Sequence, residues 1–423
     1  MNNRELLLQS FFAALGSADP LMIIPHHLPR PPKGKTLVVG AGKAAAAMAK
    51  AVENHWPADQ ALEGLVITRY GHSLPTAKIR VIEAGHPVPD ESGEQAAREL
   101  LRAVQSLGDD DLLLALISGG GSSLMSLPCA GISMADLKAV TKDLLNCGAT
   151  IQEINTVRKH LSLIQGGQLA ATCKAPVCAL MISDVTGDEP TFIASGPCAP
   201  DPTTYADALD VVARYKISAP TSIQNHLAQG ARGAIAETPK PGDKIFARVE
   251  NIVIATAQQS LQAAADFFQT QNITPVILGD SVTGEARDVA KVYAALAKQI
   301  RQHQSPFKTP VALISGGETT VTMRGNGRGG RNTEYLLSLA IELDGMENVY
   351  ALACDTDGID GSEANAGALL MPDSLTRAKQ KNIKYKQLLT NNDGYGFFSA
   401  LDDLVVTGPT RTNVNDFRVI LIL

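Results

Sequence analysis

The hexapeptide Ala-Leu-Ile-Ser-Gly-Gly at residues 115–120 occurs a second time, letter for letter, at residues 312–317. Each copy closes a short apolar run, which is typical of a buried parallel strand, and then breaks into a Ser/Gly loop. Loops at the carboxyl ends of such strands bind ligands in open α/β sheets, and their backbone N–H groups can face an anion. The two copies predict two α/β lobes whose loops face one active-site cleft.

The chain has 423 residues, of which 45% are hydrophobic and 19% charged, as is usual for a soluble protein of two or three domains. The net charge of −6 and an aromatic content of 4% favour neither a nucleic-acid nor an anionic-membrane partner. The six cysteines lack metal-ligand spacing, and no apolar run reaches the ~18 residues of a spanning helix. We expect a cytoplasmic monomer or homodimer that acts on small molecules.

Strands, loops and helices alternate on both sides of residues 236–244, a segment with the composition of a linker. This order predicts an α/β fold with two Rossmann-like lobes, mainly parallel sheets and an inter-domain active-site cleft. The predicted domains are residues 1–235 and residues 245–423. A strand at residues 251–256 is expected to open the second lobe.

Residues 40–43, Gly-Ala-Gly-Lys, lie between a predicted strand and an Ala-rich helix. The glycine spacing fits a dinucleotide-binding loop, but the next strand ends in Thr68-Arg69, where an acid should bind the ribose. The leading glycine and the Ser/Thr of a Walker loop are absent too. What remains is a lysine at a helix N-terminus, which favours binding of phosphate or carboxylate. A solvated lysine is the alternative.

Two acidic segments follow predicted strands. Residues 183–189 (SDVTGDE) and residues 355–361 (DTDGIDG) carry three carboxylates each. Such sets can hold Mg²⁺ or supply a base that accepts a hydroxyl proton. The second segment departs from an EF-hand calcium loop because its glycine comes too early. Ordinary polar turns, or stacked Asx turns in the second segment, are the alternatives.

Residues 324–331, Arg-Gly-Asn-Gly-Arg-Gly-Gly-Arg, combine three arginines with four glycines. Forked guanidinium donors on a backbone that can approach a ligand closely suit phosphate clamping. Asn332 is placed to cap the next helix, whose N–H groups would add to an anion site; a disordered basic loop is the alternative. Together these segments predict phosphoryl transfer, which needs positioning and charge neutralisation. No Ser-His-Asp set stands out, and His86 and His160 are interpreted as turn and helix residues.

The same segments resemble the two-domain glycerate kinases with a C-terminal MOFRL domain. The similarity extends from one end of the chain to the other, with runs that include VVGAGKAAAAMA (38–49), GHPVPD (85–90), SGGGSSL (118–124), ISDVTGDEP (182–190) and GPTRTNVND (408–416). The resemblance implies ATP- and Mg²⁺-dependent phosphorylation of D-glycerate to 2-phosphoglycerate, in glycerate, glyoxylate or tartrate catabolism. Members have also been labelled hydroxypyruvate reductases, so an NAD(P)H-dependent reductase is the alternative. A non-catalytic sugar-acid sensor is a third hypothesis.

The resemblance also implies roles for individual residues. Lys43 and Arg331 are expected to neutralise charge in catalysis, and Asp184 is expected to act as the base. The carboxylates expected at the metal are Asp188, Glu318, Asp355 and Asp357. The expected substrate- and nucleotide-binding residues are Gly42, Ser118, Gly119, Gly120, Gly121, Ser122, Ser123, Arg158, Gly316, Gly317, Arg328, Asn413 and Asn415. Arg411 departs from the family pattern, which has glycine at this position.

Overall fold

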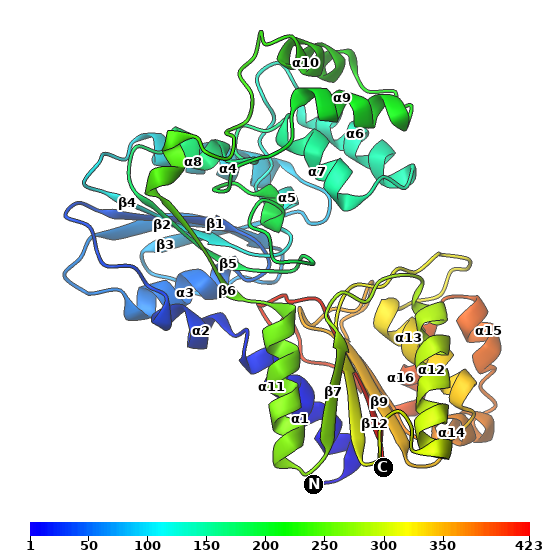
Figure 1. The fold of residues 1–423 in the computed structure, drawn as a ribbon. Coiled ribbons are helices and arrows are strands. Elements are labelled where there is room, and N and C mark those ends of the chain that lie inside the picture. The colour runs from blue at the N-terminus through cyan, green and yellow to red at the C-terminus, as the bar shows by residue number, and fades with distance from the viewer. The chain divides into compact units, whose positions relative to one another are not determined.

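The computed structural model describes all 423 residues, and the chain divides into two compact units (Figure 1). We call residues 20–254 the first-sheet unit, and residues 1–19 together with 255–423 the second-sheet unit. Each name refers to one six-stranded sheet. The units are described separately below.

The first sheet has the strand order β3-β2-β1-β4-β5-β6. Its strands are β1 (Thr36–Ala41), β2 (Leu62–Arg69), β3 (Ile79–Ala84), β4 (Leu112–Ile117), β5 (Val177–Ile182) and β6 (Val249–Ala255). The pairs from β3 to β5 are parallel. Strands β1, β4 and β5 are buried along their whole length, as expected for short apolar runs without alternation. The strand order reverses between β1 and β4, the position at which open α/β sheets bind ligands.

Helices cover both faces of the first sheet. In Figure 1, α3 lies on one face, and α4 and α8 lie on the other, where they share one apolar core with β1, β4 and β5. Helices α6, α7, α9 and α10 form a second core of their own. The helices of this unit are α2 (Pro20–Ile23), α3 (Ala45–His55), α4 (Glu91–Gln105), α5 (Gly121–Leu124), α6 (Met134–Asn146), α7 (Ile151–Lys159), α8 (Gln168–Thr172), α9 (Tyr205–Arg214) and α10 (Thr221–Ala231), with short 3-10 turns η1 (Ile24–His26), η2 (Ile193–Ser195) and η3 (Lys244–Arg248).

The second sheet has the order β11-β10-β9-β12-β8-β7. Its strands are β7 (Thr274–Gly279), β8 (Val311–Ser315), β9 (Val349–Asp355), β10 (Gly367–Leu370), β11 (Leu404–Val405) and β12 (Asp416–Ile422). Only β7 and β8 pair in parallel, because β12 lies between β9 and β8 and runs against both, while β10 runs against β9 and β11. The prediction of two α/β lobes is confirmed, but this sheet is mixed and not mainly parallel.

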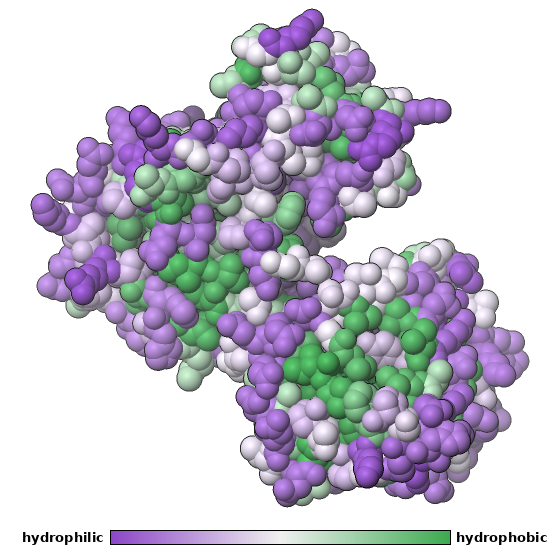
Figure 2. All heavy atoms as spheres, viewed as in Figure 1, coloured by the Kyte–Doolittle hydropathy of each residue, from purple (hydrophilic) through white to green (hydrophobic).

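Two helical layers also cover the second sheet. One apolar core joins it to α1 and α11, and another joins it to α12, α13, α14 and α16. Figure 2 shows apolar surface over β7, the edge strand, whose residues are mostly half-buried. The helices are α1 (Asn3–Gly16), α11 (Ala257–Thr270), α12 (Ala286–His303), α13 (Arg331–Leu343), α14 (Ser374–Gln380), α15 (Tyr385–Thr390) and α16 (Gly394–Leu401).

The packing units differ from the predicted division of the chain at both ends of the first-sheet unit. Helix α1 belongs to the second-sheet unit, where Leu7 and Phe11 share a core with α11. Strand β6 lies beside β5 in the first sheet, although residues 251–256 were expected in the second lobe. Residues 236–244 are part of the first-sheet unit, since Asp201 accepts a hydrogen bond from Thr238. The Pro/Gly composition here reflects a turning chain, not a boundary.

No single helix is both long and apolar enough to cross a membrane. One bent pair of helical segments, Asn3–Gly16 with Pro20–His26, passes that test by length and composition alone.

Candidate active site

The Gly-Ala-Gly-Lys loop and the first SGG loop leave neighbouring strands, β1 and β4, and bond to each other. The backbone N–H of Lys43 donates to the carbonyl of Gly119 at 2.9 Å. A methyl group on Gly120 would lie 2.9 Å from Nε2 of His86 and 3.5 Å from Cγ of Lys43. The side chains of Lys43 and His86 thus both border the glycine turn. His86, interpreted from sequence as a turn residue, is a neighbour of the candidate site that the motifs did not reveal.

The glycines before Lys43 serve close packing between these two loops. A Cβ on Gly42, whose φ is +139°, would lie 2.0 Å from Oγ of Ser118. That hydroxyl oxygen accepts the backbone N–H of Ala44 at 3.1 Å. Only glycine fits such an approach. Of the two glycines that look like a dinucleotide loop, Gly42 is therefore required by the contact with Ser118, and Gly40 by its approach to the carbonyl oxygen of Leu116.

Asp184 lies at the same edge of the first sheet as the two loops. Strand β5 ends at Ile182 and pairs in parallel with β4, so the loops that follow these strands are neighbours. Asp184 and Asp188 are both half-buried. The structure thus brings Lys43, the first SGG loop and the acidic segment to one edge of the first sheet.

Helix α7 and the segment after it hold these loops in place. Arg158 and Gln165 both donate to the carbonyl of Ser122, at 2.6 and 2.8 Å. The hydroxyl of Ser195 donates to Asn155 and lies 2.8 Å from the hydroxyl of Ser122. Burial lowers the pKa of Arg158 to about 10. Arg158, predicted to bind ligand, supports the SGG loop from behind.

A buried ion pair between Lys159 and Asp201 fixes part of the chain that follows Asp184. Nζ of Lys159 lies 2.8 Å from the hydroxyl of Thr191 and 3.4 Å from Asp201, and both charged side chains are almost fully buried. Burial lowers the pKa of Lys159 in spite of its partner. Burial opposes ionisation of Asp201 as well, but Lys159 and Thr203 outweigh it and hold the pKa of Asp201 below its ordinary value. Such a pair is costly to break.

Arg331 begins α13 in the second-sheet unit and is surrounded by three carboxylates. Its Nε lies 2.9 Å from both oxygens of Asp416, Nη2 lies 2.8 Å from Asp355, and Nη1 lies 2.9 Å from Glu318. Burial opposes its charge, but the three acids outweigh burial and raise the pKa of Arg331 well above its ordinary value. The side chain of Glu318 is 58% exposed, whereas Asp355 and Asp416 are buried. Two of the carboxylates predicted to bind metal, Glu318 and Asp355, are therefore paired with an arginine.

The second SGG loop is held by a buried arginine. Arg418 donates to the carbonyls of Gly316 and Gly317 at 3.1 and 3.3 Å, and to Asp416 at 2.5 Å. Asp416 thereby links Arg331 to the loop. Neither Asp416 nor Arg418 was selected from sequence. Their signal is two charges in the otherwise apolar run DFRVILI, a pattern that indicates a buried pair.

The Asp-rich loop after β9 is stabilised by its own carboxylates. Asp355 accepts the backbone N–H of Asp357 at 3.0 Å, and Asp357 accepts the N–H two residues further on at 2.8 Å. These are the Asx turns that the sequence left open. Thr356 donates its N–H and its hydroxyl to the carbonyl of Asn415, whose own N–H donates to Asn413. Asn413 and Asn415 are buried supports of this loop.

The N-terminus of α13 is capped within the chain. Asp360 accepts the backbone N–H groups of Asn332 and Thr333, each at 2.9 Å. The prediction that Asn332 caps this helix and opens it to an anion is wrong, because the carboxylate of Asp360 already satisfies these donors.

Two glycines of residues 324–331, Gly325 and Gly327, pack against the turn at residues 391–393. The N–H groups of Arg324 and Gly325 donate to the side chain of Asn392. A Cβ on Gly325 would lie 2.2 Å from Oδ1 of Asn391. Gly325 therefore permits a close approach of Asn391, which belongs to the chain itself, and not of a ligand. Arg328 is exposed and lies over the ring of Tyr395 at 4.8 Å.

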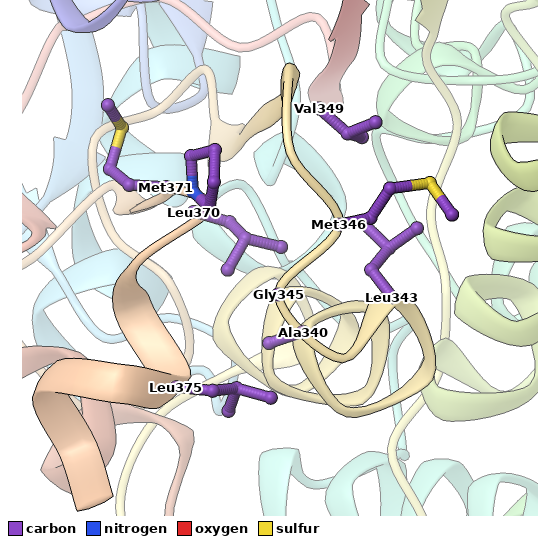
Figure 3. Close-up of a pocket in the computed structure, with 9 residues that line it drawn as sticks. Ala340, Leu343, Gly345, Met346, Val349, Leu370, Met371 and Leu375 are labelled. Carbon is purple, nitrogen blue, oxygen red and sulfur yellow. The ribbon is translucent and has the colours of Figure 1, made fainter. Parts of the chain in front are cut away.

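Neither a metal cage nor the cavity in Figure 3 provides a site. No three or more His, Cys, Asp and Glu side chains form a group that could hold a metal ion. Figure 3 shows the residues that line a small cavity. The volume of this cavity is about 10 Å³, which has room for about one water. Its lining is apolar and comes from the end of α13 and the chain around β10 and α14: Ala340, Leu343, Gly345, Met346, Val349, Leu370, Met371, Pro372 and Leu375.

Known proteins are similar over the whole chain. A domain of unknown function, DUF4147, matches residues 6–228, and the MOFRL family matches residues 311–416. A protein from Agrobacterium vitis that carries a hydroxypyruvate reductase label is 50% identical over 99% of this chain and 94% of its own length. The D-glycerate 2-kinase of Thermotoga maritima is 38% identical over 99% of this chain and 98% of its own.

A solved structure agrees with these relatives. The crystal structure of a glycerate kinase (EC 2.7.1.31) from Thermotoga maritima has a TM-score of 0.88 at 38% identity, and the match covers 99% of both chains. The resemblance inferred from the motifs is confirmed. The chain belongs to the glycerate kinase family in which a DUF4147 domain precedes a C-terminal MOFRL domain.

Proposed function

We propose that the protein is a glycerate 2-kinase, which transfers the γ-phosphoryl group of ATP to the 2-hydroxyl of D-glycerate. The observation that carries the proposal is the meeting of Lys43, the first SGG loop and the chain of Asp184 at the strand-order reversal of the first sheet. The identity of the substrate is inferred from the relatives, which are named as glycerate kinases. We further propose a cytoplasmic monomer or homodimer that serves glycerate, glyoxylate or tartrate catabolism.

The proposed step needs a base and positive charge. The carboxylate of Asp184 accepts the hydroxyl proton while the hydroxyl oxygen bonds to the γ-phosphorus and the β–γ bridging P–O bond breaks, which releases ADP. Lys43 offsets the negative charge that develops on the phosphoryl group. Arg331, in the second-sheet unit, is assigned to phosphate charge as well. The first SGG loop binds an anionic group.

The carboxylates present suit a Mg²⁺ ion that arrives with ATP. Kinases usually hold Mg²⁺ with one or two carboxylates, water and phosphate oxygens, and not with a protein cage. Because Glu318 and Asp355 are paired with Arg331, Asp188 is the candidate metal contact of the first-sheet unit, and Asp357 is the candidate of the second-sheet unit. When bound, Mg²⁺ would neutralise phosphate charge.

The test is ADP release by the purified protein with Mg²⁺, ATP and D-glycerate, with enolase as the coupling enzyme. ADP release with an immediate enolase signal is expected, because enolase uses 2-phosphoglycerate directly. An enolase signal that requires an added mutase would place the phosphoryl group on the 3-hydroxyl. No ADP release, together with oxidation of NADH by hydroxypyruvate, would overturn the kinase and support the reductase.

A further inference from the structure

A pocket of about 250 Å³ lies in the second-sheet unit beside Arg331. One wall comes from the chain after the second SGG loop, at Thr319, Val321 and Met323. The lining also includes Gly329 and Gly330. Counted as water at ~30 Å³ each, the volume corresponds to roughly eight molecules. We call it the Thr319 pocket.

Both sides of the Thr319 pocket are fixed by backbone hydrogen bonds. Thr320 donates to Gly284 and accepts from Ala286, each at 2.8 Å. On the other side, the N–H of Tyr395 donates to the carbonyl of Arg328 at 3.0 Å. The pocket is therefore preformed, and a ligand need not order its walls.

A buried hydroxyl without a partner lines the pocket. Thr319 is only 3% exposed, and its Oγ1 has no hydrogen-bond partner. A buried hydroxyl left unpaired is costly, and a ligand in the pocket can supply the missing bond. Glu334 and Asn392 add further buried polar groups, with Asn392 donating to Glu334 at 3.2 Å. Because Glu334 and Asn392 also bond to other parts of the chain, the Thr319 hydroxyl is the group that suits a ligand with a hydroxyl or ring nitrogen.

The remaining lining is apolar on one side and cationic on another. Val321 is half-buried and Met323 is 64% exposed, so both present apolar surface beside polar groups. A three-carbon acid has little apolar surface to pack against these side chains, whereas a planar base can lie against them. The guanidinium of Arg331 borders the same pocket, and its pair with the exposed Glu318 is the contact that a phosphate group can replace.

We propose that the Thr319 pocket binds the nucleoside part of the nucleotide, with its phosphates directed to Arg331. The base lies along Val321 and Met323, and a hydroxyl or ring nitrogen bonds to Thr319. This inference rests on the proposed kinase function.

The experiment compares three variants of the full chain. Val321→Phe fills the pocket, and Val292→Phe, on the exposed face of α12 where Val292 is 68% exposed, is the matched control. Thr319→Val removes the hydroxyl and keeps the shape. We measure ADP affinity by calorimetry and KM for ATP and for D-glycerate. We expect Val321→Phe to weaken ADP binding about tenfold or more, and Thr319→Val to weaken it about two- to tenfold. KM for D-glycerate should be unchanged in the two pocket variants. The Val292→Phe control should match the wild type in all three measurements.

Two results would overturn the inference. One is a raised KM for D-glycerate with unchanged ADP affinity, which would make the pocket a site for the three-carbon acid. The other is unchanged ADP affinity in both pocket variants. If Val321→Phe does not fold, Thr319→Val decides alone. Failure of the kinase proposal is seen separately, as missing ATP-dependent phosphorylation by the wild-type protein.

Discussion

The two SGG loops share one hexapeptide but have different neighbours. The first loop accepts the N–H of Lys43 and borders the side chains of Lys43 and His86. The second loop directs its carbonyls to Arg418, which is 1% exposed. The repeated sequence decides how each strand ends, and residues distant in sequence decide what each loop contacts. We infer that the neighbours of the first loop serve turnover and that those of the second serve stability.

The largest expected effect is on turnover and concerns the first loop. Lys43→Ala and Asp184→Asn should each lower kcat by about 10²–10⁴-fold, because they remove charge stabilisation and a base. Steady-state kinetics of ADP release measure this. Lys50→Ala, on the helix α3 that follows Lys43, is the control and should retain normal kcat. Near-normal turnover in Lys43→Ala or Asp184→Asn would contradict the assigned role.

The next effect is on the free energy of unfolding and concerns the second loop. Asp416→Asn leaves Arg331 and Arg418 without their shared buried carboxylate, so it should cost about 3–5 kcal/mol. Urea unfolding measures it. The control is Glu318→Gln, whose exposed pair with Arg331 should contribute less than about 1 kcal/mol. Equal losses in both variants would show that burial does not set the strength of this cluster.

The sharpest test compares the serines at equivalent positions of the two hexapeptides. Oγ of Ser118 accepts the N–H of Ala44, whereas Oγ of Ser315 is buried without a partner. Ser118→Ala should therefore cost about 1 kcal/mol in the free energy of unfolding, and Ser315→Ala should cost about zero. Urea titrations of both variants measure the difference. A larger loss in Ser315→Ala would reverse the comparison.

The smallest expected effect lies in the chain that leads to Asp416. Arg411 has a φ of +59°, a region in which glycine is not strained. Arg411→Gly should raise the free energy of unfolding by at most about 1 kcal/mol, because relief of strain is partly offset by the freer unfolded chain. Thermal unfolding measures it, with Asn382→Gly as the control, since this exposed asparagine at φ +56° tolerates the same region. A loss in Arg411→Gly would show that its side chain contributes more than its strain costs.

The sequence predicts the strands with buried apolar runs but not their partners. Strands β1, β4 and β5 follow from their composition, and so do the two repeated loops. The direction of β12 cannot be predicted in this way. A short strand buried on both faces has the same apolar pattern whether it pairs in parallel or antiparallel. The sheet to which β6 belongs is equally hidden, since strand pairing is decided by distant residues.

The candidate site divides in the same way. Lys43 and Asp184 could be selected from the sequence because each lies in a loop that directly follows a predicted strand. The carboxyl ends of parallel strands share one edge of the sheet, so such loops are neighbours. His86 approaches Gly120 only in the folded chain. The roles of the glycines near Gly42 and Gly325 also depend on what lies opposite, Ser118 in one case and Asn391 in the other, and no local pattern contains that information.

The position of β12 has a consequence for the order in which the protein is made. The second sheet needs residues 416–422 between β9 and β8, and α1 needs α11, which follows the first-sheet unit in the sequence. As the chain leaves the ribosome, the first-sheet unit can therefore complete its fold by residue 254, while α1 waits for its partner. The second-sheet unit closes only when synthesis has delivered β12, a central strand, so it can complete its fold only after the first-sheet unit.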